Sequence, residues 1–103
     1  MTRALHSGET VVATGTFLYD GSVECDLRIV FSPVRYGTGD YEDPPDVAND
    51  TVVDTYYIQF GSTTHRGTYP STYGVCRSLD EARTVAEAAP GIGTTIQWHR
   101  GAA

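Results

Sequence analysis

The strongest structural signal in this sequence is a run of alternating residues that begins at Val23. Apolar side chains stand at every second position up to Phe31: Val23, Cys25, Leu27, Ile29 and Phe31. The positions between them are polar apart from Val30. A period of two is typical of a β-strand that buries one face. The run therefore predicts a strand with its apolar face against a core.

The segment Thr10–Leu18 before this run predicts the partner strand of a hairpin, with a turn at Asp20-Gly21. A two-residue loop would set Val12, Thr14, Thr16 and Leu18 against the apolar face. A three-residue loop, Tyr19-Asp20-Gly21 with a left-handed Gly21, would instead set Val11, Ala13, Gly15 and Phe17 there. Burying Phe17 rather than two threonines favours the longer loop, since a large buried side chain contributes about 1.5–3 kcal/mol.

A capping box predicts where the helix of the chain begins. In Ser78-Leu79-Asp80-Glu81 the Ser78 hydroxyl can accept from the Glu81 amide, while the Glu81 carboxylate reaches back to the Ser78 N–H. Pro90-Gly91 predicts the end of the helix. Between them, one apolar stripe recurs at helical spacing: Leu79, Ala82, Val85, Ala86 and Ala89. The stripe predicts a helix packed along one side.

Three further strands complete the predicted fold. Thr51–Phe60 directs Val52, Tyr56, Ile58 and Phe60 to one face, with Asp54 as the exception. Thr72–Arg77 and Thr94–His99 are shorter, and the last of them carries Ile96 and Trp98 on one face. The order β-β-β-β-α-β predicts an α+β fold, an antiparallel sheet of about five strands with one helix packed on one face. At 103 residues the chain predicts a single small domain, residues 1–103.

The net charge of the chain comes from one long loop, predicted at about residues 33–50. The formal charge is −6, and the acids outside the range 39–54 are balanced by arginines. The six acids within that range are Asp40, Glu42, Asp43, Asp46, Asp50 and Asp54. Loops longer than about 12–15 residues are uncommon in compact domains and tend to be functional or disordered.

The acidic loop supports three interpretations. The first is a solvated connector without a function of its own. The second, a cation site, is weak because the calcium-loop spacing is absent and Pro44-Pro45 interrupts a tight cradle. The third is a surface for a basic protein partner, formed by Tyr36, Asp40, Tyr41, Glu42, Asp43 and Asp46. Carboxylates steer such a partner and tyrosine supplies contact area at low entropic cost, so the third leads among the functional interpretations, with the solvated connector left open beside it.

The same residue types suit a cationic small molecule, because a ring face and a carboxylate both attract positive charge. A separate alternative function is a small-ligand binder with a cavity between sheet and helix, lined by Tyr56, Ile58, Val75, Val85 and Trp98. The charge and the absence of a basic stripe argue against nucleic-acid binding.

Enzymatic chemistry has little support in the sequence, so a small enzyme is the third alternative and no catalytic residue is assigned. No G-x-S-x-G motif occurs, and Cys25 falls among core positions, where a thiol is inert. Cys76 precedes the helix N-cap by two residues, where the helix dipole could lower its pKa, but structural packing is its expected role. His6, His65 and His99 are scattered without zinc-type pairing, so no metal or other cofactor is predicted.

The environment of the protein is also predicted. No apolar run approaches the roughly 18 residues of a membrane helix, and residues 1–6 lack the apolar core of a secretory signal. These features predict a cytoplasmic protein that does not enter membranes. Since a five-stranded sheet that stays open has two edges, a two-fold symmetric homodimer is expected.

Overall fold

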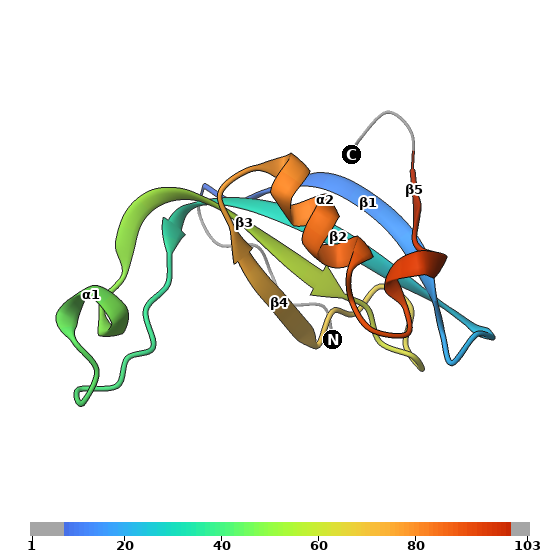
Figure 1. The fold of residues 1–103 in the computed structure, drawn as a ribbon, viewed down its shortest axis with the longest axis horizontal. Coiled ribbons are helices and arrows are strands. Elements are labelled where there is room, and N and C mark those ends of the chain that lie inside the picture. The colour runs from blue at the N-terminus through green and yellow to red at the C-terminus, as the bar shows by residue number, and fades with distance from the viewer. Residues whose placement is uncertain (1–7, 100–103) are drawn as a thin grey trace.

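A computed structural model describes residues 8–99 of the chain. These residues form a five-stranded sheet with strand order β4-β3-β2-β1-β5, in which neighbouring strands are antiparallel. Helix α2 lies across one face of the sheet (Figure 1). The elements in chain order are β1 (Thr10–Tyr19), β2 (Val23–Arg35), α1 (Pro45–Ala48), β3 (Thr51–Phe60), β4 (Ser71–Cys76), α2 (Leu79–Glu87), the 3-10 turn η1 (Gly93–Thr95) and β5 (Gln97–Trp98). The predicted α+β class, strand number and helix position are confirmed.

The β1–β2 hairpin buries the face that the sequence predicts. Phe17 pairs with Cys25 and Ala13 with Ile29, and Phe17 and Ala13 are almost completely buried. The loop itself is shifted by one residue from the prediction. Tyr19 pairs with Val23, so the connection is residues 20–22. Both Asp20 (φ 53°) and Gly21 (φ 71°) are left-handed, and this conformation turns the chain tightly enough to keep Tyr19 in the ladder.

Strand β2 is longer than predicted and shortens the acidic loop. It continues through Pro33 to Arg35, although residues 33–50 were expected to form the loop. Pro33 is tolerated because β1 pairing ends at Phe31 and the β2–β3 register shifts between Ser32 and Val34. Pro33 therefore lies at a bulge, where its lack of a backbone N–H removes no hydrogen bond between the strands. The rest of the predicted loop contains the single helical turn α1.

Strand β3 has the predicted bounds, but only part of its predicted apolar face is buried. Tyr56, Ile58 and Phe60 pack with the core, whereas Val52 is 88% exposed. The last predicted strand is also shorter, because Gly93–Thr95 forms the turn η1 and only Gln97–Trp98 pairs with β1. Close approach makes this pairing possible, since a Cβ at Gly15 would lie 2.6 Å from the Gln97 carbonyl oxygen.

Helix α2 begins at the predicted cap. The Ser78 hydroxyl accepts from the Glu81 N–H at 3.0 Å. The Glu81 carboxylate, however, accepts from the N–H of Arg77 (3.3 Å) rather than from that of Ser78. Among residues 8–99, no helix has both the length and the hydropathy needed to cross a bilayer.

The core lies between the sheet and α2. Ala82 and Ala86 of the helix are fully buried with Leu27, Ile29 and Ile58 of the sheet. The middle of β2 is buried on its other face too, because Arg28 and Val30 are also covered. The Arg28 guanidinium lies 4.2 Å from the ring centre of Tyr69. Its Nε donates to Gln59 Oε1 at 2.7 Å, so this charge is buried with a partner.

Candidate functional site

The feature that departs furthest from the compact sheet is an extension formed by residues 33–54, here called the acidic arm. Strand β3 pairs with β4 only from Tyr56 onward, so its first residues have β2 as their neighbour. Figure 1 shows the arm extending away from the part of the sheet that α2 covers, with α1 near its far end. The arm contains all six acids of the charged segment.

Hydrogen bonds within the arm hold it in one shape. The Thr38 and Gly39 amides donate to the Val47 and Ala48 carbonyl oxygens at 3.1 and 3.0 Å. One guanidinium nitrogen of Arg35 donates both to the Asp46 carbonyl oxygen (2.8 Å) and to the Thr51 hydroxyl (3.1 Å). These bonds join α1 and its flanking segment to the two strands. The tip is therefore tied to both strands of the arm.

Tyr57 fastens the base of the arm to the sheet. Its hydroxyl accepts from the Tyr36 N–H at 2.9 Å and donates to the Val34 carbonyl oxygen at 3.2 Å. The rings of Tyr36 and Tyr57 stack with centres 6.0 Å apart. Burial raises the pKa of Tyr57, so its hydroxyl stays protonated and able to donate. Tyr36 also donates to Glu9 Oε2 at 3.2 Å, so this predicted partner-binding residue supports the arm.

The predicted acidic site residues divide into two groups. Asp43 accepts from the Thr38 hydroxyl at 2.7 Å, and Asp40 accepts from the Glu42 N–H at 2.9 Å. These carboxylates hold the loop, as does Asp50, which accepts from the Gly37 N–H at 2.9 Å. The side chains of Glu42 and Asp46 have no hydrogen-bond or ion-pair partner within residues 8–99, and they remain available at the surface.

Apolar side chains accompany the free carboxylates on the arm. Tyr41 is 92% exposed and stands between Asp40 and Glu42 in the chain. Val47 of α1 and Val53 of β3 are also exposed. Tyr41 therefore exposes its ring to water next to the carboxylate of Glu42.

The residues predicted to line a ligand cavity do not face one space. Ile58 is completely buried in the core, and half-buried Tyr56 packs edge-on against Phe31. Val75 pairs with Tyr57, so it lies on the sheet face away from α2, where it is 56% exposed. Trp98 donates from its indole N–H to Glu87 Oε2 at 2.7 Å. The sheet and the helix meet here through packed side chains.

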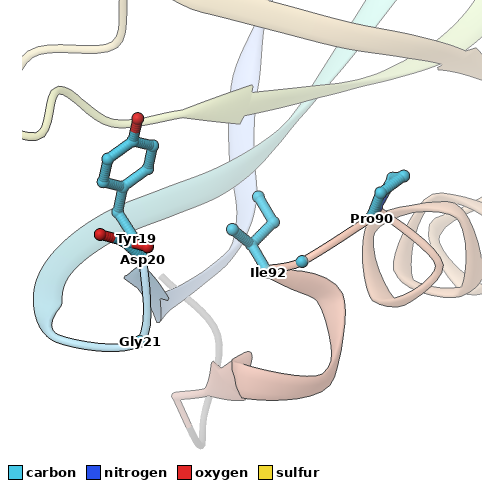
Figure 2. A pocket seen from close by; sticks show the side chains of 6 residues that line it. Tyr19, Asp20, Gly21, Pro90 and Ile92 are labelled. Atoms are coloured by element: carbon cyan, nitrogen blue, oxygen red, sulfur yellow. The ribbon is translucent and has the colours of Figure 1, made fainter.

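Two adjoining hollows lie instead at one end of the sheet. Their volumes are about 480 and 450 Å³, and both are lined by Tyr19, Pro90 and Ile92. We call them together the sheet-end groove. Figure 2 shows Tyr19 and Asp20 on one side of the first hollow and Ile92 and Pro90 on the other. The sequence marks Tyr19, Asp20 and Pro90 only as turn or helix-stop residues and gives Ile92 no role, because these residues meet only in the tertiary fold.

The structure gives no support to a reactive thiol. Cys25 and Cys76 are free and buried. Burial raises the pKa of both thiols, and the nearby Glu81 carboxylate raises that of Cys76 further. The helix dipole therefore does not lower the pKa of Cys76, and its burial fits the packing role expected from the sequence. Within residues 8–99, histidine, cysteine and acidic side chains form no cluster that could hold a metal ion. His6 lies outside the described residues.

The chain matches no protein-family model, and comparison with curated proteins and with solved structures gives no match.

Proposed function

We propose that the protein is a non-enzymatic interaction domain whose acidic arm binds a basic protein partner. The observation that carries the proposal is Tyr41, which is 92% exposed next to the unpaired carboxylate of Glu42. The arm is already ordered by its own hydrogen bonds, so little conformational entropy is lost when a partner binds. Its charge accelerates the encounter with a basic surface, and the tyrosine supplies the buried contact.

A charge-matched pair of variants tests this proposal. Glu42→Gln with Asp46→Asn removes two charges from the arm, and Asp80→Asn with Glu87→Gln removes two charges elsewhere, because glutamine at position 87 still accepts from the Trp98 indole N–H. The probe is a synthetic peptide with arginine at alternate positions, titrated by calorimetry at several salt concentrations. The arm variant should bind about tenfold more weakly at low salt and show a flatter salt dependence. The control variant should bind like the wild-type protein.

A third variant separates a specific surface from a general attraction between opposite charges. Tyr41→Ala leaves the net charge unchanged and should weaken peptide binding further. The altered arm side chains have no partners within residues 8–99, so each change should alter the free energy of unfolding by less than about 0.5 kcal/mol. Equal binding by the arm and control variants would exclude the arm as the binding surface.

A further inference from the structure

The sheet-end groove has a composition that suits a small ligand. Three separate segments form its walls: the β1–β2 turn, the segment after α2 and the loop after β3. Phe17 and Phe60 line the second hollow, with their rings edge to face and 5.3 Å between centres. Apolar and aromatic walls of about this size are typical of small-molecule sites.

Hydrogen bonds fix the two sides of the groove relative to each other. The Thr95 hydroxyl accepts from the Leu18 N–H at 2.9 Å and donates to the Ile92 carbonyl oxygen at 2.6 Å. This bridge joins strand β1 to the segment that carries Ile92. On the other side, the Gly61 N–H donates to the Asp26 carbonyl oxygen at 2.6 Å and positions the loop after β3. The groove is thus preformed, which reduces the cost of binding.

The charge of the groove selects the kind of ligand. Asp20 is the one charged side chain among the residues that line the two hollows. Its carboxylate has no hydrogen-bond or ion-pair partner in the described part of the chain. Tyr19, which precedes it, is about half exposed and lines both hollows. A carboxylate and a tyrosine ring both attract a cation, and the absence of a lining arginine disfavours an anion.

We propose that the sheet-end groove binds a small organic amine with an aromatic body. The ring of the ligand occupies the hollow lined by Phe17 and Phe60, and its ammonium group lies between Asp20 and the ring of Tyr19. This site is separate from the acidic arm, and the proposal does not depend on the function of the arm.

The test uses phenethylamine and its neutral counterpart phenethyl alcohol as probes. Each is titrated into the full chain while backbone amide signals are followed by NMR. We expect phenethylamine to bind about threefold to tenfold more tightly than the alcohol. The largest shifts should fall at Tyr19, Phe60 and Ile92, because these residues line the hollows.

Asp20→Asn provides the decisive variant. Asparagine tolerates the left-handed conformation of position 20 (φ 53°), so the turn is retained while the charge is lost. The preference for the amine should disappear in this variant and persist in Asp54→Asn, which alters the arm instead. Equal binding of both probes by the wild-type protein would overturn the proposal. So would amine-induced shifts confined to the arm, or no shift with either probe at tens of millimolar.

Discussion

Arg66 binds Asp26 through two parallel hydrogen bonds, from Nε to Oδ2 at 2.9 Å and from Nη2 to Oδ1 at 2.6 Å. Another nitrogen of the same guanidinium donates to Glu24 at 3.1 Å. The contact joins the loop after β3 to strand β2, across 40 positions of sequence. Bidentate pairing of this kind fixes geometry as well as charge, so it positions the wall of the sheet-end groove that the loop forms.

The Arg66–Asp26 pair makes the free energy of unfolding depend on pH. The hydrogen bonds from Arg66 lower the pKa of Asp26 below its usual value. A lowered pKa stabilises the fold above the unfolded-state pKa of about 3.9, and that stabilisation is lost as the pH falls through the folded-state pKa. Arg66→Met should therefore lower the free energy of unfolding more at pH 7 than at pH 2. Urea titrations at both pH values measure this difference, with Arg77→Met as the exposed control. An equal loss at both pH values would contradict it.

The cap of α2 gives a prediction of stability. Ser78→Ala leaves the Glu81 N–H without its acceptor and should lower the free energy of unfolding by about 1 kcal/mol. Ser78→Asp keeps an acceptor at the cap and serves as the control. Urea unfolding followed by circular dichroism compares the two variants. Unchanged stability of Ser78→Ala would show that this bond does not hold the first turn.

The two groups of carboxylates in the arm should behave differently. Asp43→Ala removes the acceptor of the Thr38 hydroxyl, so the amides of Thr38 and Gly39 should exchange with deuterium faster. Glu42→Ala removes a side chain without a partner and should leave these rates unchanged. Global stability should be the same in both variants, because the arm lies outside the core. Identical exchange in the two variants would mean that Asp43 does not order the arm.

The open edge of the sheet leads to a prediction of self-association. Strand β4 is the outermost strand at one side and exposes Tyr73 and Val75. Unpaired strand edges favour pairing between copies, and we expect a two-fold symmetric homodimer through β4 at about 100 μM. Light scattering should show a dimer for the wild-type chain and a monomer for Val75→Lys. Val47→Lys, at an exposed valine of the arm, should remain dimeric. A monomeric wild-type chain at this concentration would rule the prediction out.

Local signals predicted most of the fold. The cap at Ser78 and the alternation from Val23 are properties of neighbouring residues, and the structure contains both elements. The prediction that Phe17 is buried was correct. The free energy lost by exposing a large apolar side chain exceeds the small energy differences between turn types. The loop was predicted one residue too early. Asp20 adopts a left-handed conformation, which aspartate favours less than glycine does, so the residue type at position 20 did not indicate this turn.

The parts that sequence reasoning missed depend on long-range contacts. Strand β2 continues past Pro33 because β1 has already ended beside it, which no local pattern reveals. The acidic loop was predicted to start at about residue 33, whereas β2 continues to Arg35, and the arm is held by Tyr57, 21 positions after Tyr36. The sheet-end groove was missed entirely, because Tyr19 and Ile92 come together only after the whole sheet has formed.

The pairing of Gly15 and Thr16 with the last strand also determines when the fold can be completed. Strands β1 to β4 follow one another as neighbours, so each can join the sheet soon after the ribosome releases it. Strand β5 instead joins β1, which by then has waited until β2, β3, β4 and α2 have all been synthesised. During that interval the outer edge of β1 is exposed to other nascent chains. Premature termination before Gln97 would leave this edge permanently open, so we expect truncated products to aggregate.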